Sequence, residues 1–274
     1  MIRISDLTVE YPSHGASPAH LALCGLSATV ADGEVLGVLG EAGSGKSTLA
    51  RVLAGDATFG RREGRPVITG GDSSVLEFSL RHMKQSQHSK YTFHVGHLTQ
   101  DAGEALPPTL TVSEAISEPV LLRDRRYNRQ ALGTRVATLL DAVRLPLGIM
   151  DSFPYELSGG QRQRVAIARA LVLDPRVFIA DEPTAGIDVT VRDSVIDVLN
   201  ELREERGFSA VVISHDVTVL RRATTHVAVL YRGGVVGYGP IDEVLADPRH
   251  PYVAGLAESF ASNSRGGGSR GQER

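Results

Sequence analysis

The sequence has no tryptophan and a single cysteine among its 274 residues, and it lacks long apolar runs. The lone Cys24 excludes an intrachain disulfide framework and fits a reducing compartment. We expect it to be a small buried apolar residue rather than a reactive thiol. No run approaches the roughly 20 apolar residues of a membrane-spanning helix. Residues 1–6 also lack the apolar core of a signal peptide. Any association with a membrane is therefore expected to be peripheral.

A strong charge of either sign is also missing. The formal net charge is −3 and the isoelectric point is near 6.3, so the chain offers no basic field to a nucleic acid. We therefore expect no nucleic-acid partner. Hydrophobic residues make up 42% and charged residues 22% of the sequence, as in ordinary globular proteins. A chain of this length can bury a substantial core as one large α/β domain.

Alternating apolar and polar residues in the N-terminal region predict half-buried antiparallel strands. The pattern covers Ile2–Tyr11 and residues 21–30, with a turn predicted at 12–18 between them. Further strands are predicted at 67–69 and 92–98.

A short apolar strand at 35–39 runs directly into a glycine-rich loop, and a helix is predicted over Lys46–Leu53. Strand, loop and helix in this order are the context that a phosphate-binding loop requires. The candidate nucleotide-binding residues of this phosphate loop are Gly40, Glu41, Ala42, Gly43, Ser44, Gly45, Lys46 and Ser47, with Thr48 after them. The glycines let successive backbone N–H groups face phosphate oxygens, and the helix adds the positive end of its dipole. We expect Lys46 to contact the β- and γ-phosphates and Ser47 to ligate Mg²⁺.

The rest of the chain alternates helices with strands. Helices are predicted at Val112–Arg123, at 130–143 and from the N-cap Ser158 to residue 173, which together give a helical subdomain over about 101–172. The apolar run at 177–180 predicts a parallel strand that is buried on both faces. A helix, a strand, a hairpin and two more helices are then predicted, at 189–205, 210–214, 227–238, 242–246 and 252–259. Residues 261–274 are rich in Gly, Ser and Arg and are expected to be disordered.

Two adjacent carboxylates end the apolar strand at 177–180. We expect Asp181 to hold Mg²⁺ and Glu182 to act as general base for the attacking water. Two such carboxylates can also be a charge cluster at a helix N-terminus. The apolar run before them and Pro183 and Thr184 after them favour the catalytic interpretation.

Residues 157–161 read Leu-Ser-Gly-Gly-Gln and are followed by a basic, apolar helical run. The phosphate loop followed by this signature segment resembles the arrangement in the ATP-binding cassette (ABC) ATPases, over about residues 1–260. The resemblance implies a P-loop NTPase fold of the α/β class, with a parallel-sheet core, an N-terminal antiparallel β subdomain and a helical subdomain. It also implies ATP hydrolysis, with ATP and Mg²⁺ bound.

Further single residues match motifs of this family. Tyr11 matches the aromatic residue that stacks on adenine, and His215 matches the switch histidine. Gln100 matches the glutamine that reaches the metal and couples to the membrane subunit. Residues 185–188, which end at Asp188, lie where the family has its D-loop. Their sequence Ala-Gly-Ile-Asp departs from the usual Ser/Thr-Ala-Leu-Asp, so communication between two sites is expected to differ.

The signature segment is expected to act on another chain's nucleotide. Its residues Ser158, Gly159, Gly160 and Gln161 begin a helix and form an anion-binding terminus. The phosphate loop already serves this chain's own nucleotide. The expected ligand is therefore the γ-phosphate held by a second ATP-binding subunit, identical or different.

Two segments are similar to the branch of peptide and nickel importers: residues 181–191, with their Val-Thr-Val ending, and the run His250-Pro251-Tyr252. We expect an ATPase that powers import of oligopeptides or dipeptides, with nickel or metal-chelate import as the alternative. The implied partners are transmembrane permease subunits and, indirectly, an extracytoplasmic solute-binding protein. The implied location is peripheral, at the cytoplasmic face of the membrane.

Other interpretations are weaker. An ABC ATPase of DNA repair is disfavoured because the chain has no long coiled-coil heptads, and one of translation because it has a single phosphate loop. After Gln100 the chain lacks the branch's usual Ser-Leu-Asn-Pro, and it lacks a cysteine-rich extension. Two clusters are expected to be solvated surface rather than ligand sites. They are His82, His88, His94 and His97, and Arg162, Arg164 and Arg169.

Overall fold

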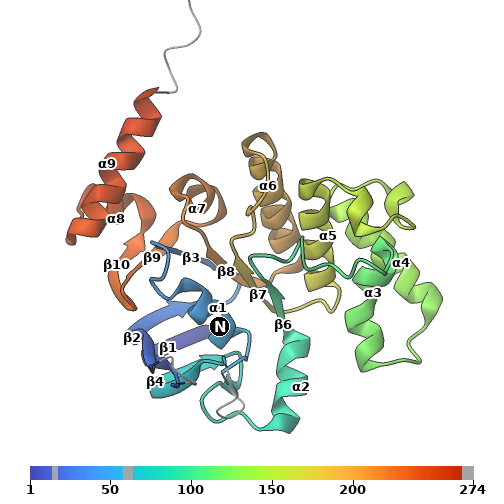
Figure 1. The fold of residues 1–274 in the computed structure, drawn as a ribbon, viewed down its shortest axis with the longest axis horizontal. Coiled ribbons are helices and arrows are strands. Elements are labelled where there is room, and N and C mark those ends of the chain that lie inside the picture. Colours follow the sequence, from blue (N-terminus) through green and yellow to red (C-terminus); the bar gives the residue numbers. More distant parts are fainter. Residues whose placement is uncertain (14–17, 58–63, 267–274) are drawn as a thin grey trace, which may run out of the picture.

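The computed structural model of the chain describes residues 1–13, 18–57 and 64–266, and it contains two sheets with helices between and around them (Figure 1). The four-stranded sheet has the order β2-β1-β4-β5 and the six-stranded sheet the order β10-β9-β3-β8-β7-β6. The antiparallel sheet consists of β1 (Ile2–Tyr11), β2 (His20–Val30), β4 (Val67–Val75) and β5 (Phe78–Ser79). The other sheet consists of β3 (Val35–Gly40), β6 (Val95–Leu98), β7 (Val177–Asp181), β8 (Ser209–Ile213), β9 (His226–Tyr231) and β10 (Gly234–Pro240).

The six-stranded sheet is parallel except at β10, which pairs antiparallel with β9. All five residues of β7 and of β8 are buried, as the continuous apolar runs predict. Along β7, Val177 and Ile179 face the core shared with the four-stranded sheet, whereas Phe178 and Ala180 face the helices on the other side. The predicted strand is therefore confirmed, and burial on both faces explains why its sequence does not alternate.

Helices cover both faces of this central sheet. The helix α1 (Lys46–Leu53) packs between the two sheets, and α2 (Gln85–His94) leads into β6. At one end of the molecule α3 (Val112–Arg123), α4 (Arg129–Ala142) and α5 (Gly159–Leu171) pack against one another (Figure 1). The remaining helices are α6 (Val189–Arg206), α7 (Val217–Ala223), α8 (Ile241–Ala246) and α9 (Pro251–Gly266), and two short 3₁₀ turns lie at Leu147–Ile149 and Pro154–Glu156. No helix among the described residues is long and apolar enough to cross a membrane.

The strand predicted at 92–98 is wrong in its first half. Residues 92–94 belong to α2, and only Val95–Leu98 is extended. Tyr91 is fully buried at this end of α2, where its hydroxyl donates to the Leu53 carbonyl and its ring packs edge-on against Phe78. This tertiary anchor outweighs the strand propensity of the β-branched and aromatic residues that follow.

Cys24 is exposed, so its predicted burial is wrong. The pairing of β1 with β2 shifts between Leu7 and Val9, which pair with Leu26 and Leu23. Three steps along β2 therefore match two along β1, and Gly25 has a positive φ of 65° at this bulge. The bulge turns the Cys24 side chain away from the core, while its backbone N–H donates to the Gly233 carbonyl at 2.8 Å.

Several boundaries also differ from the sequence expectation. The strand predicted at 67–69 continues to Val75 as β4. The helix after Ser158 ends at Leu171, a difference within the usual variation of helix ends. The backbone of residues 261–266 is helical as the end of α9, so the predicted disorder is wrong there, and residues 267–274 lie outside the described part of the chain. Of the turn predicted at 12–18, residues 14–17 lie outside it as well.

Candidate active site

The phosphate loop leaves the end of β3 and enters α1. Gly43 and Gly45 have positive φ angles of 78° and 103°, which L side chains rarely adopt. A Cβ at Gly45 would lie 2.5 Å from the carbonyl oxygen of Ala22 in β2. A Cβ at Gly40 would lie 2.5 Å from the carbonyl oxygen of Leu230 in β9. The loop is therefore pressed against two neighbouring strands and can be built only with glycine at these positions.

Lys46 is folded back onto the loop. Its Nζ donates to the carbonyl oxygens of Gly40 and Glu41, each at 2.8 Å. Burial lowers the pKa of Lys46, and the charges of Glu182, Asp181 and Glu41 oppose this shift. The ammonium group thus lies in a partly desolvated position where its charge interacts strongly with a bound anion.

Asp181 ends β7 with a buried carboxylate, 5% exposed. Burial raises its pKa and Glu182 adds to the rise, whereas a hydrogen bond with the Ser47 hydroxyl and the charge of Lys46 oppose it. Its Oδ1 atom is buried and has no hydrogen-bond partner among the described residues. A desolvated carboxylate oxygen beside a hydroxyl is the hard oxygen donor set that Mg²⁺ prefers, so these residues fit that ion.

Glu182 is held in an unusual backbone conformation. Its φ is +50°, which is uncommon for a residue other than glycine, and its N–H donates to the Ile213 carbonyl at 2.9 Å. Such strained residues concentrate at functional sites. This conformation could not be predicted from the local sequence, because it depends on the contact with the neighbouring strand β8.

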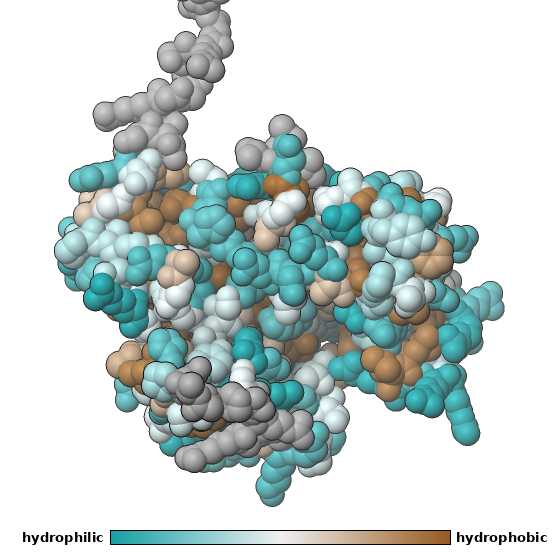
Figure 2. Space-filling model, in the orientation of Figure 1, coloured by the Kyte–Doolittle hydropathy of each residue, from teal (hydrophilic) through white to brown (hydrophobic). Residues whose placement is uncertain are grey.

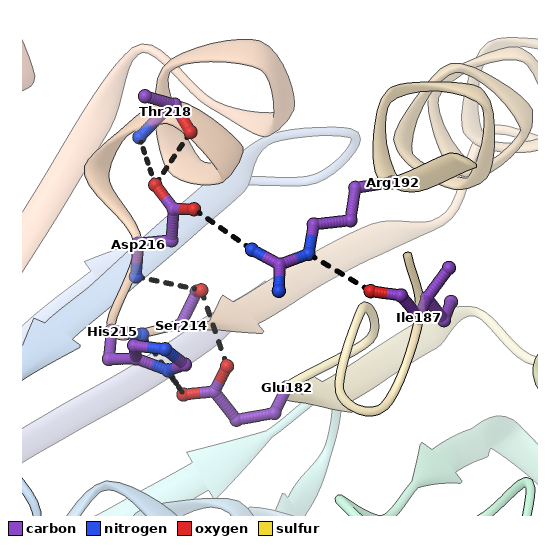
Figure 3. Close-up of polar contacts among 7 residues, drawn as sticks. All are labelled: Glu182, Ile187, Arg192, Ser214, His215, Asp216 and Thr218. Atoms are coloured by element: carbon purple, nitrogen blue, oxygen red, sulfur yellow. Dashed lines mark hydrogen bonds and ion pairs between the residues drawn. The ribbon is translucent and has the colours of Figure 1, made fainter. Parts of the chain in front are cut away.

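His215 holds the Glu182 carboxylate (Figure 3). The Oε1 atom of Glu182 accepts a hydrogen bond from the backbone N–H of His215 at 2.9 Å, and it lies 2.8 Å from the ring Nδ1. The Ser214 hydroxyl donates to Oε2 at 3.3 Å. Both carboxylate oxygens of Glu182 are thus fixed from the loop that follows β8.

One cavity of about 380 Å³ collects most of the candidate site residues. It is lined by Tyr11, His20, Ala22, Ala42, Gly43, Gly45, Lys46, Ser47, Thr48, Gln100, Asp181, Glu182 and His215. A second cavity of about 520 Å³ adjoins it, since Ser47, Gln100 and Asp181 line both, and Gly159 lines the second. Residues that lie far apart in the sequence therefore meet around one hollow.

Tyr11 lies at the end of β1, directly opposite His20 on β2. Its hydroxyl lies 3.3 Å from the hydroxyl oxygen of Thr48 and accepts a hydrogen bond of 3.3 Å from Arg51. The Arg51 guanidinium also lies 5.9 Å from the centre of the Tyr11 ring. Sequence reasoning missed His20 and Arg51. Only weak features of the sequence point to these two residues. His20 could be found from the register of the two predicted strands, and Arg51 from its place in the helix after the phosphate loop.

The signature segment lies apart from the smaller cavity. Ser158 is the N-cap of α5: its hydroxyl accepts from the Gln161 N–H at 3.3 Å, and the Gln161 side chain accepts from the Ser158 N–H at 2.9 Å. Neither these two residues nor Gly160 line the cavity beside the phosphate loop. Asp188, the last residue of the D-loop, is exposed.

The prediction that the arginines of α5 form a solvated face is wrong in part. All three arginines are half-buried. Arg169 does pair with an acidic neighbour, Glu118, at 2.6 Å. Arg162 and Arg164 instead donate to backbone carbonyls, among them that of Leu157 at 2.7 Å and that of Gly160 at 3.3 Å. These two bonds join the first turns of α5 to the signature segment, residues 157–161.

The histidine cluster is spread over different elements. His88 and His94 lie on α2, whereas His97 lies half-buried on β6 with its Nε2 buried. Burial lowers the pKa of both His88 and His97. The expectation of a solvated position is therefore wrong for His97. Within the described ranges, no group of three or more His, Cys, Asp or Glu residues is placed to hold a metal ion.

Known sequences and structures resemble most of the chain. The sequence model of the ABC transporter family matches residues 23–185. The chain is 34% identical to a putative peptide import ATP-binding protein of Brucella abortus, with 96% of this chain and 76% of that protein covered. It is 35% identical to the oligopeptide transport ATP-binding protein OppF of Escherichia coli, with 93% and 76% covered. For OppD of Bacillus subtilis the identity is 32%, with 95% and 72% covered.

A solved structure gives the same fold. An ATP-binding cassette in a dimeric, post-hydrolysis state with ADP and Pi bound has a TM-score of 0.76 and 27% sequence identity. The likeness covers 88% of this chain and 99% of that one. Family model, relatives and fold agree with the motifs around the cavity, and the chain therefore belongs to the ABC transporter family, as an ATP-binding cassette ATPase.

Proposed function

We propose that this ATPase powers the import of oligopeptides or dipeptides through a transmembrane transporter. The observation that carries the proposal is the placing of Glu182, oriented by His215, in the same cavity as the phosphate loop. The relatives named for peptide import support the substrate class. Residues 181–191 and the run His250-Pro251-Tyr252 support the same branch.

The nucleotide is bound by groups of known charge. The backbone N–H groups of the phosphate loop and the start of α1 face the phosphates of ATP. Lys46 then exchanges its two carbonyl partners for the β- and γ-phosphate oxygens, which carry full negative charge. Tyr11 stacks on adenine at the edge of the same cavity, with its hydroxyl held by Thr48 and Arg51.

Ser47, Asp181 and Gln100 are the residues that would hold Mg²⁺, since all three line both cavities. The ion would neutralise phosphate charge and orient the phosphate chain. The raised pKa of Asp181 reflects a carboxylate poorly solvated by the protein alone, which a cation would stabilise.

Hydrolysis requires a base beside the γ-phosphate. Glu182 accepts a proton from the attacking water as the new bond to the γ-phosphorus forms. The bond between that phosphorus and the bridging oxygen breaks, which gives ADP and phosphate. His215 and Ser214 keep the two carboxylate oxygens in place during this step. Most of the catalysis is then positioning and charge stabilisation.

The site is completed by a second ATP-binding subunit. In this chain, Ser158, Gly160 and Gln161 lie outside the cavity of the chain's own phosphate loop. We infer that they bind the γ-phosphate held by the other subunit, with Asp188 at the same interface. The dimeric state of the structurally similar cassette supports this arrangement.

The transmembrane permease subunits are inferred to dock beside Gln100 and the predicted helical subdomain of about 101–172. An open cavity of about 520 Å³ lies there. Figure 2 shows an apolar area over α3, and Leu122 of this helix is 72% exposed. The chain would thus lie at the cytoplasmic face of the membrane, and a solute-binding protein would act through the permease alone.

The proposal is tested by transport. The chain, co-produced with transmembrane permease subunits and reconstituted in liposomes, should drive ATP-dependent uptake of labelled di- to pentapeptides. Liposomes with the Glu182→Gln chain are the matched control and should take up none. Uptake of nickel instead of peptides would contradict the peptide assignment, and ATP hydrolysis without any permease association would contradict a role in transport.

A further inference from the structure

Two loops flank Glu182, and one arginine joins them (Figure 3). The D-loop, residues 185–188, follows Glu182, and residues 214–216 follow β8. Arg192, near the start of α6, reaches both. Its Nε donates to the Ile187 carbonyl at 3.3 Å, and its Nη1 lies 3.5 Å from Oδ2 of Asp216. Neither the family motifs nor the sequence reasoning singled out this residue.

The Asp216 end of this link is firmly fixed. Its Oδ1 accepts hydrogen bonds from the backbone N–H of Thr218 at 2.8 Å and from its hydroxyl at 2.6 Å. The backbone N–H of Asp216 donates to the Ser214 hydroxyl oxygen at 3.1 Å. That hydroxyl in turn donates to Oε2 of Glu182 at 3.3 Å. A continuous chain of polar contacts therefore runs from Arg192 to the carboxylate of Glu182.

The D-loop end of this link contains a glycine with open space around it. Gly186 has a positive φ of 67°, and no atom outside its two neighbours in the chain lies within 4 Å of where its Cβ would be. A glycine in open space leaves the backbone free to change conformation. Ile187 next to it is buried, 5% exposed, so its carbonyl is a fixed point once Arg192 holds it. The planar guanidinium suits this task because its N–H groups diverge toward two acceptors.

We propose that Arg192 is a positioning residue, which locks the D-loop to the loop of His215 and thereby holds Glu182 in its working orientation. This inference rests on the proposed role of Glu182 as general base. Arg192 does not line the nucleotide cavity, so it acts on the hydrolytic step and leaves nucleotide binding unchanged.

The test is steady-state ATP hydrolysis by the full chain with Arg192→Ala. The value of kcat should fall about ten- to a hundredfold, the effect of a small misplacement of reacting groups. The KM for ATP should stay within about twofold, since the phosphate loop is untouched. Arg192→Lys should recover part of kcat, because an ammonium still attracts Asp216 but has no fork to reach the Ile187 carbonyl as well.

Two further variants separate positioning from stability. Arg206 lies at the far end of α6 from Arg192, where it pairs with Asp174. The variant Arg206→Ala should therefore leave kcat unchanged. Asp216→Asn removes the charge that Arg192 contacts. If both act through one link, the double variant Arg192→Ala/Asp216→Asn should be no slower than the slower single variant.

Hydrogen exchange gives a measure that does not depend on turnover. Amides in residues 184–188 and 214–218 should exchange faster in Arg192→Ala, whereas those in Val112–Arg123 should be unchanged. Wild-type kcat in Arg192→Ala, an equal loss in Arg206→Ala, or unaltered exchange in both loops would overturn the inference. The wild-type chain runs in the same assay, so absence of hydrolysis there would contradict the proposed function instead.

Discussion

Glu182 and His215 are joined twice, through the backbone N–H and through the ring of the histidine, at 2.9 and 2.8 Å from the same carboxylate oxygen. The two side chains differ sharply in exposure: Glu182 is 9% and His215 is 73% exposed. The carboxylate is thus fixed in the protein, while the imidazole that holds it faces the open side of the cavity. A ligand that enters from that side meets the histidine and the base together.

Replacing Glu182 by glutamine should separate binding from hydrolysis. The amide oxygen can still accept from the His215 N–H, but the side chain cannot take a proton from water. We expect kcat to fall by at least about a hundredfold. The dissociation constant for ATP, measured by titration calorimetry, should change by less than about threefold. A large loss of ATP affinity would mean that Glu182 serves the nucleotide rather than the water.

Ser158→Arg should block the closing of two subunits on ATP. In the Glu182→Gln chain, bound ATP is not hydrolysed and contacts both subunits, so ATP should produce a stable dimer. The arginine adds bulk at the α5 terminus where the γ-phosphate of the other subunit is expected. Size-exclusion chromatography with and without ATP measures the dimer. Ser158→Ala is the control for the lost N-cap, with an expected cost of about 1 kcal/mol in unfolding free energy. Equal dimerisation of the Glu182→Gln chain alone, with Ser158→Arg and with Ser158→Ala would contradict the role of the signature segment.

Lys46→Ala should nearly abolish ATP binding. The ammonium group is the principal cation beside the phosphates, and its loss also frees the carbonyls of Gly40 and Glu41 that it now holds. Fluorescence titration with a labelled ATP analogue measures the affinity. Lys90→Ala, an exposed lysine on α2, is the control and should bind as the wild type does. Wild-type hydrolysis rates in the Lys46 variant would refute the assignment of the loop.

The sequence predicts best those parts of the fold in which local pattern and burial agree. The helix Val112–Arg123 has the predicted bounds, and Ser158 is the N-cap that its position before two glycines suggested. The strand at β7 was also predicted, because burial on both faces leaves a continuous apolar run. In these cases each local preference is consistent with the tertiary environment.

Tertiary contacts decide the cases that the sequence could not predict. The burial of Tyr91 extends α2 over residues with strand propensity, and the bulge at Gly25 turns Cys24 outward. At the site, the motifs indicated which residues to examine but not how they are oriented. The positive φ of Glu182 and the position of Arg192 between two loops depend on the packing of β7, β8 and α6. Such contacts join residues far apart in the chain and leave no periodic pattern.

His97 should make the stability of the folded chain fall in mild acid. Burial lowers its pKa from 6.5, Arg51 adds to the shift and Asp56 opposes it. The unfolded chain therefore binds a proton more readily than the folded chain does. The stabilising contribution is complete above pH 6.5 and is lost as the pH falls through the lower folded-state value. His88 has the same direction of shift and adds to the loss.

The variant His97→Met tests this pH dependence, because methionine fills the half-buried position without titrating. The unfolding free energy from urea titrations should fall less steeply below pH 6.5 in this variant than in the wild type. His82→Gln alters an exposed histidine and should keep the wild-type slope. If His97→Met also keeps that slope, the buried ring is not the group that titrates.

Gly45→Ala should damage the chain even without nucleotide. Its φ of +103° is strained for alanine, at a cost of about 1–2 kcal/mol. The new Cβ would also lie 2.5 Å from the backbone oxygen of Ala22, which cannot move without disturbing β2. Gly33→Ala is the matched control, since its φ is +76° but nothing lies within 4 Å of its Cβ position.

Urea unfolding of both variants without ATP then separates the cost of the backbone conformation from the cost of the steric clash. The unfolding free energy of Gly33→Ala should fall by about 1–2 kcal/mol, the conformational cost alone, and this variant should bind ATP normally. The unfolding free energy of Gly45→Ala should fall by about 1–3 kcal/mol more, the usual cost of forced overpacking. Its ATP affinity should also fall, because the phosphate loop loses its shape. Equal losses in the two variants would show that the loop moves away from Ala22 freely. In that case the contact with β2 does not hold the phosphate loop in its shape.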